Sequence, residues 1–228
     1  MFYFGDSTFI LLIPAILFSL YAQTKISGTF QKYSRVASRS GYTASDVARR
    51  ILDMNGLQNV RIERIRGSLT DHYDPRHHVL RLSDTVHNST SIAALGVAAH
   101  EAGHAVQHST GYVPLFMRNT IAPIASFGSS MSWILIMAGL FMQWFELIQI
   151  GIIFFLAVVV FHLITLPVEF NASKRAVAML TDSGVITRDE VAPARKVLSA
   201  AALTYVAAAL TAVLQLLRFV LLANRRRN

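Results

Sequence analysis

The chain has 228 residues, of which 53% are hydrophobic and only 15% are charged. Soluble domains carry about 25% charged residues, so this composition excludes an ordinary soluble domain and favours a membrane protein. The net charge is +8 and there is no cysteine, which excludes disulfides and thiol chemistry and leaves His, Asp and Glu as metal ligands. The basic residues are spread between apolar blocks, which is typical of charges flanking membrane helices and not of a nucleic-acid-binding surface.

Four stretches are long and apolar enough to cross a bilayer as helices, which takes about 20 residues. The first contains Asp6 and no preceding basic segment, so we expect a retained anchor instead of a cleaved signal peptide. Only residues 143–146 separate the second from the third, which predicts an antiparallel helical hairpin. The predicted spans are 2–22, 121–142, 147–168 and 198–223.

Two polar segments, 23–120 and 169–197, carry most of the basic residues near the membrane ends. The positive-inside rule therefore predicts that both lie in the cytoplasm and that the N-terminus lies outside. The Arg-Arg-Arg run at 225–227 would contradict this orientation if the last helix crossed fully, so a crossing and a tilted helix both stay open.

The longer polar segment reads as a small α+β unit. Residues 43–56 predict a helix that begins at Thr43 or Ser45, and residues 60–65 alternate like a half-buried strand. Residues 68–83 predict two strands around a turn at Asp74 and Pro75. A further helix is expected over 88–112, between capping residues and Gly111.

This last helix contains the sequence His-Glu-Ala-Gly-His at 100–104. His100 and His104 lie on one helix face, about 6 Å apart along the axis, so both imidazoles can bind one zinc ion. Glu101 lies beside them, where it can act as general base on zinc-bound water. His108 lies about 12 Å along the axis from His100, too far to share a site with Zn–N bonds of about 2 Å.

Glu169 is the predicted third ligand. The two helices of the hairpin lie between His104 and Glu169, and two crossings return the chain to the membrane face from which it started. A His/His/Glu set forms an open, hydrolytic zinc site with its fourth position left to water. The alternative is that Glu169 is an interfacial charge at the end of a membrane helix.

Four segments together resemble the neutral zinc metallopeptidases of bacterial membranes, the YugP type, and more distantly the gluzincins of the HtpX type. The resemblance implies one Zn²⁺ per chain, held by His100, His104 and Glu169, with Glu101 as the catalytic base. Many gluzincins have an Asp four residues after the ligand Glu, where this chain has Ser173, which can hydrogen-bond a ligand histidine but carries no charge. The segments are VAAHEAGHAVQ (97–107), LTDHYDP (69–75), LRLS (80–83) and LPVEFNASKRA (166–176).

The sequence thus predicts an α+β integral membrane protein with about four transmembrane helices and a small gluzincin-like metallopeptidase domain. The expected function is that of a multi-pass zinc endopeptidase of the cell membrane, which hydrolyses membrane or membrane-proximal proteins at the membrane surface from the cytoplasmic side. Its expected partners are the lipid bilayer and a peptide or membrane-protein substrate, without nucleic acid. The predicted organisation is an anchor (1–22), the metallopeptidase domain (23–120), the hairpin (121–168), the Glu169 segment (169–197), and a last helix with a basic tail (198–228).

Two other functions remain open. A site-2-type intramembrane zinc protease also uses this histidine motif, but takes its third ligand from an Asp-Gly motif that this sequence lacks. A catalytically weak zinc-binding membrane scaffold would agree with the uncharged Ser173. The oxyanion-stabilising residue also stays open among Tyr73, His72, His78, Arg175 and Tyr205.

Overall fold

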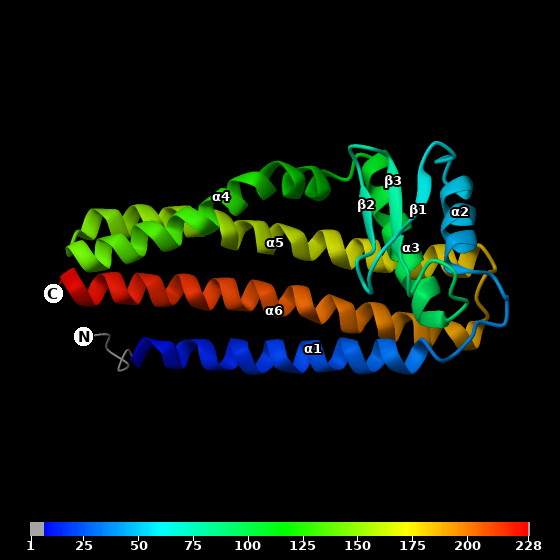
Figure 1. Ribbon diagram of the computed structural model, residues 1–228, viewed down its shortest axis with the longest axis horizontal. Coiled ribbons are helices and arrows are strands. Elements are labelled where there is room, and N and C mark those ends of the chain that lie inside the picture. The colour runs from blue at the N-terminus through cyan, green and yellow to red at the C-terminus, as the bar shows by residue number, and fades with distance from the viewer. Residues whose placement is uncertain (1–6, 228) are drawn as a thin grey trace. The chain divides into compact units, whose positions relative to one another are not determined.

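The computed structural model describes residues 7–227 of the chain (Figure 1). By their contacts these residues divide into two compact units. We call the first, made of residues 7–22, Phe116–Pro167 and 204–227, the helical unit, and the second, made of Gln23–Leu115 and Val168–Leu203, the mixed unit. The elements are η1 (Ser7–Leu12), α1 (Ile13–Tyr33), α2 (Ala44–Met54), β1 (Arg61–Ile65), β2 (His72–Asp74), β3 (Val79–Ser83), α3 (Ile92–Ser109), α4 (Val113–Met142), α5 (Phe145–Asp182) and α6 (Arg188–Arg227).

Four helical segments in the described part of the chain are long and apolar enough to cross a membrane. All four predicted spans fall in them, although residues 2–6 of the first prediction lie outside the described residues. The fold is therefore α+β with four candidate membrane helices, as the sequence predicted. The segments are Thr8–Tyr33, Val113–Met142, Phe145–Asp182 and Arg188–Asn224.

Helix α5 corrects one expectation, because it does not end at residue 168. It passes through Pro167 and continues to Asp182. A proline removes one backbone hydrogen bond, which membrane helices tolerate. The residues beyond it have an apolar face, since Ala172, Ala176 and Leu180 are fully buried at four-residue spacing. Glu169 consequently lies inside a continuous helix instead of following a helix end.

A short connection joins α4 and α5. Gln143 adopts a positive φ of 55° in the connection, and the backbone N–H of Trp144 donates to the carbonyl of Gly139 at 2.9 Å. Gly139 and Gly151 have no room for a Cβ, so the two helices pack closely through small residues, as membrane helices commonly do. The apolar core of the helical unit is Ile136, Ile148, Phe155, Val159, Ala212, Phe219 and Ala223.

In the mixed unit, a three-stranded sheet has the order β1-β3-β2, with β1 parallel and β2 antiparallel to β3. The predicted β2–β3 turn is confirmed, with His72 opposite Arg81. Helix α2 begins after its N-cap Thr43, whose side chain and Asp46 form a capping box. Helix α3 begins after Ser91, whose side chain accepts the N–H of Ala94 at 3.2 Å.

Helix α3 is the centre of the core of the mixed unit. Its alanines at 94, 98, 99, 102 and 105 are buried together with apolar residues of α2, β3, α5 and α6. At Gly103 the helix meets α5 so closely that an added Cβ would lie 3.0 Å from the carbonyl oxygen of Ala172. This contact holds the motif helix directly against the turn of α5 that contains Glu169.

Two glycines of α3 predict opposite effects of substitution by alanine. Gly103→Ala pushes a methyl group against the backbone of α5, whereas a Cβ at Gly96 would have only Ala194 O nearby, at 4.0 Å. Gly96→Ala should therefore raise the free energy of unfolding by up to about 1 kcal/mol through helix propensity, and Gly103→Ala should lower it. Denaturant unfolding of both variants in detergent measures this difference, and equal stabilisation by both would show that the contact at Gly103 is not tight.

Candidate metal centre

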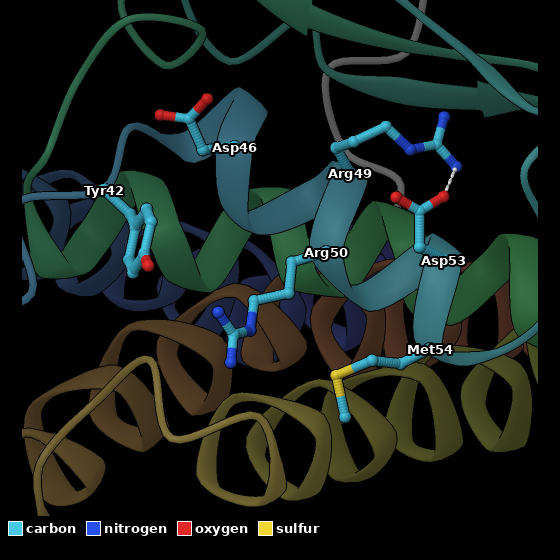
Figure 2. Close-up of a pocket in the computed structure, with 6 residues that line it drawn as sticks. All are labelled: Tyr42, Asp46, Arg49, Arg50, Asp53 and Met54. Atoms are coloured by element: carbon cyan, nitrogen blue, oxygen red, sulfur yellow. Dashed lines mark ion pairs between the residues drawn. The ribbon is translucent and has the colours of Figure 1, made fainter.

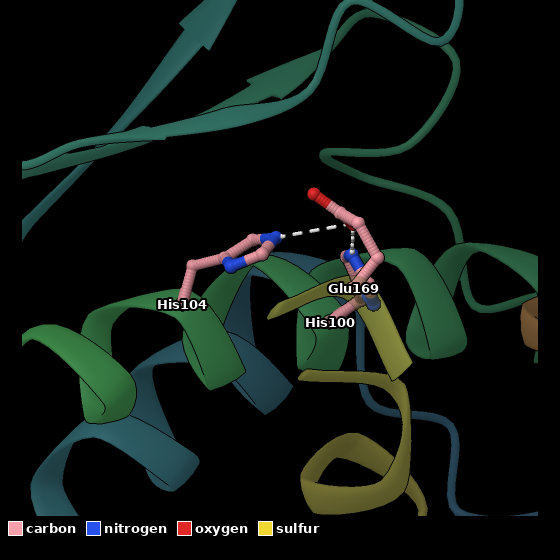
Figure 3. A group of neighbouring side chains, drawn as sticks. All are labelled: His100, His104 and Glu169. Carbon is pink, nitrogen blue, oxygen red and sulfur yellow. Dashed lines mark hydrogen bonds and ion pairs between the residues drawn. The ribbon is translucent and has the colours of Figure 1, made fainter. Parts of the chain in front are cut away.

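Three of the predicted site residues converge at one point of the mixed unit (Figure 3). His100 and His104 come from α3 and Glu169 from α5. The Nε2 atom of His100 lies 3.2 Å, and that of His104 3.6 Å, from the same oxygen, Oε2 of Glu169. One ligand atom from each of the three residues lies within 4.8 Å of the other two.

These distances fit a zinc ion. Zinc bonds to nitrogen and oxygen are about 2.0–2.2 Å long, and a tetrahedral arrangement therefore separates neighbouring ligand atoms by about 3.3 Å. The separations of 3.2 Å and 3.6 Å match such an edge. Two imidazoles and one carboxylate are also the ligands of an open hydrolytic zinc site.

Both histidines of this cluster contact an uncharged group through their other ring nitrogen, Nδ1. Ser173 Oγ lies 3.2 Å from Nδ1 of His100, and Oε1 of Gln107 lies 3.0 Å from Nδ1 of His104. When each Nδ1–H donates to its partner, each Nε2 lone pair is left to point at the metal. Ser173 thus reaches the histidine that the sequence resemblance implied. Gln107 was missed as a partner, although its position three residues after His104 places it near the same helix face.

The centre is largely shielded from solvent and negatively charged. Glu169 is only 2% exposed. Burial by itself lowers the pKa of His104, but its hydrogen bond with Glu169 and the charge of Glu101 outweigh burial and raise that pKa. Two carboxylates that favour a positive charge on the imidazole equally favour a bound cation.

Glu101, the predicted catalytic base, is oriented by the sheet. Its Oε2 accepts the backbone N–H of Tyr73 in β2, at 3.0 Å. Sequence reasoning did not find this contact, because a backbone donor leaves no residue signature. β2 is an edge strand, so N–H groups on its outer side have no strand partner, and that of Tyr73 donates to a side chain of α3.

His108 is outside the ligand set, as its distance along the helix predicted. Its Nδ1 instead lies 3.0 Å from the hydroxyl of Tyr73. Burial, aided by the charge of Asp74, raises the pKa of Tyr73, and burial, aided by His78, lowers the pKa of His108. At neutral pH a protonated Tyr73 hydroxyl can therefore donate to a neutral His108.

The remaining candidates for oxyanion stabilisation have other contacts. His72 Nδ1 lies 2.9 Å from the carbonyl oxygen of Thr70. Arg175 donates to Oδ1 of Asn171 at 2.8 Å. The ring of His78 packs against that of His108, with centroids 5.6 Å apart, and Tyr205 belongs to the helical unit. Tyr73 is the candidate whose backbone touches the catalytic base.

A shallow hollow of about 430 Å³ along α2 contains none of the predicted site residues (Figure 2). Its Arg49 is engaged in local structure, because it donates to the carbonyl groups of Leu57 and Val60 and pairs with Asp53. Arg50 stacks over the ring of Tyr42. The hollow is therefore explained by the packing of α2 and is not assigned a function.

The family model described as "Putative neutral zinc metallopeptidase" matches residues 8–224. This chain belongs to that family. It is also 50% identical over 212 residues to "Putative membrane protease YugP" of Bacillus subtilis (strain 168), covering 93% of this chain and 94% of that protein. No solved structure matches the chain. Membership of a zinc metallopeptidase family agrees with the His100/His104/Glu169 cluster, and the membrane protease relative agrees with the four candidate membrane helices.

The contact between Ser173 and His100 predicts an effect on metal binding. Ser173→Ala removes the partner of Nδ1 and should weaken zinc affinity by roughly 10- to 100-fold. Ser173→Asp should restore or tighten binding, because a carboxylate accepts the same hydrogen bond with more charge. Competition with a chromogenic chelator measures both affinities.

Ser183→Ala is the matched control, since this buried serine also makes one hydrogen bond, to the carbonyl of Leu180 at 3.1 Å. If Ser173→Ala binds zinc as tightly as Ser183→Ala, Ser173 does not support His100.

Proposed function

We propose that this chain is a membrane-anchored zinc endopeptidase that cleaves membrane or membrane-proximal proteins at the membrane surface. The observation that carries the proposal is the convergence of two imidazole nitrogens on one oxygen of Glu169, directly beside Glu101. Ligands and base come from one turn of α3 and one turn of α5, so a single ion and a single proton acceptor can act on one peptide bond.

The residues divide the chemistry between them. His100, His104 and Glu169 would hold the ion, which when bound would act as a Lewis acid toward the scissile carbonyl and a water molecule. Glu101 accepts a proton from the attacking water and afterwards donates it to the leaving nitrogen. The N–H of Tyr73 keeps the carboxylate of Glu101 in place, because it donates a hydrogen bond to Oε2 at 3.0 Å.

The sheet supports an extended peptide as the substrate. β2 is an edge strand, and its central residue Tyr73 presents its backbone to Glu101. An extended segment that adds to this edge would run past the catalytic base. Loops or tails of proteins that emerge from the bilayer are extended and close to the membrane, and we propose them as the substrate class.

Two observations favour a surface site over an intramembrane one. Helix α3, which carries Glu101 and both histidines, is not among the four candidate membrane helices. The sequence also lacks the Asp-Gly motif of site-2-type proteases. We further propose that the mixed unit faces the cytoplasm, since the basic residues flanking the membrane helices gather on segments 23–120 and 169–197.

Replacement of the base tests catalysis. Glu101→Gln removes the proton acceptor but none of the three ligands, so it should lower kcat by about 10²- to 10⁴-fold while about one zinc per chain remains bound. The measurement is cleavage of membrane-protein substrates by purified protein, alongside its metal content. Glu63→Gln on β1 is the control and should retain activity, because its pairs with Arg61 and Arg81 are at least partly exposed and contribute little.

Full activity of Glu101→Gln, in protein that carries zinc and no contaminating metal, would reject the mechanism. A wild-type protein that holds zinc but cleaves nothing would favour the zinc-binding scaffold.

Replacement of the third ligand tests the centre itself. Glu169→Ala should lose the zinc that the wild-type protein holds at about one ion per chain, because two histidines alone leave the ion weakly held. Glu146→Ala, an exposed position of the same helix, is the control. Metal analysis of detergent-purified protein gives the stoichiometry, and equal zinc in wild type and Glu169→Ala would place the third ligand elsewhere.

A further inference from the structure

Gln107 is a fully buried polar residue in α3. It is 0% exposed and ranks among the largest fully buried side chains of the described chain. A buried amide lowers stability unless its hydrogen bonds are made inside the protein. Its burial beside a metal centre therefore raises the question of which groups satisfy it.

Three hydrogen bonds satisfy the amide, and each one joins it to a candidate ligand or to a residue close to one in the sequence. Oε1 lies 3.0 Å from Nδ1 of His104. Nε2 donates to the carbonyl oxygen of Val168 at 2.9 Å and to Oδ1 of Asn171 at 3.0 Å. Val168 comes directly before Glu169 and Asn171 comes two residues after it. The amide is therefore hydrogen-bonded to the turn of α5 that contains the candidate third ligand.

The two ends of the amide act on different ligands. The carbonyl end accepts Nδ1–H of His104 and thereby leaves Nε2 of that ring free for the metal. The amino end fixes the position of Val168 and Asn171 along α3, and with it the position of Glu169. Leucine or methionine could fill the same volume, but neither could make any of these bonds.

We propose that Gln107 is a positioning residue of the metal centre, which sets the tautomer and orientation of His104 and aligns the Glu169 turn of α5 with α3. This proposal rests on the zinc site of the proposed function but not on peptide hydrolysis. Gln107 would touch neither the ion nor the substrate and would act through His104 and the backbone beside Glu169.

A purely structural role is the alternative, in which Gln107 only joins two helices. The two roles differ in how substitution affects zinc binding. If Gln107 only joins the two helices, its substitution lowers the melting temperature equally with and without zinc. Loss of a positioning residue also shrinks the rise in melting temperature that zinc produces, because this rise depends on the dissociation constant.

The experiment uses the full chain in detergent, with Zn²⁺ for affinity and Co²⁺ for its visible absorption, which reports tetrahedral coordination. Gln107→Met keeps the volume and removes the three bonds. It should weaken Zn²⁺ affinity by roughly 10- to 100-fold, reduce the zinc-dependent rise in melting temperature and alter the Co²⁺ spectrum. Asn171→Ala, which leaves two of the three bonds of Gln107 intact, should show a smaller loss of affinity with the fold preserved.

Leu95→Ala is the matched control, because Leu95 is a fully buried residue of the same helix without a part in the centre. It should lower the melting temperature and leave the zinc-dependent rise and the Co²⁺ spectrum unchanged. Zinc affinity of Gln107→Met within about threefold of wild type, with an unchanged rise, would overturn the proposal. If Gln107→Met does not fold, unchanged affinity of Asn171→Ala overturns it instead.

These outcomes are distinct from failure of the proposed function. A wild-type chain that binds no zinc would reject the metal centre and this proposal together. A chain that binds zinc but cleaves no peptide leaves the test of Gln107 intact, because affinity and Co²⁺ absorption require no turnover.

Discussion

The close packing of α3 against α5 is the contact on which the candidate centre depends. At Gly103 an added Cβ would lie 3.0 Å from the backbone oxygen of Ala172, so only glycine permits this distance without displacement. Two ligands lie on one side of this contact and the third on the other. The separation of the helices therefore decides whether His100, His104 and Glu169 can share one ion, since zinc bonds vary by only a few tenths of an ångström.

The surroundings of the centre combine a buried carboxylate with uncharged hydrogen-bond partners. Burial of an unpaired carboxylate is strongly unfavourable, and in the described structure the two histidines face Glu169. Ser173 and Gln107 fix the rings without adding negative charge. A carboxylate partner raises the basicity of the imidazole more than a neutral partner does, so an ion bound here would keep more of its Lewis acidity while the histidines stay oriented.

The small sheet has a part in the site that its size would not suggest. Its central strand β3 contributes Leu80 and Leu82 to the core of the mixed unit, and its edge strand β2 contributes a backbone donor to Glu101. Glu101, the proposed catalytic base, is therefore oriented by β2, whereas the three candidate ligands come from α3 and α5. An edge strand also offers its remaining backbone groups to an extended peptide, which links the position of the base to the proposed direction of the substrate.

Helical periodicity and composition were enough to predict the local features. The spacing of His100 and His104 fixed two ligands on one face, and the rise of about 1.5 Å per residue excluded His108. The apolar runs predicted the four membrane helices but not their lengths, because α5 continues through Pro167 when the residues beyond it have an apolar face to bury. The contacts of Gln107 with Val168 and of Tyr73 with Glu101 join segments that are distant in sequence. Such contacts depend on how close two elements pack and on backbone donors that every residue type shares. The sequence by itself therefore determined which side chains could bind a metal, and the tertiary structure decided which groups hold them in place.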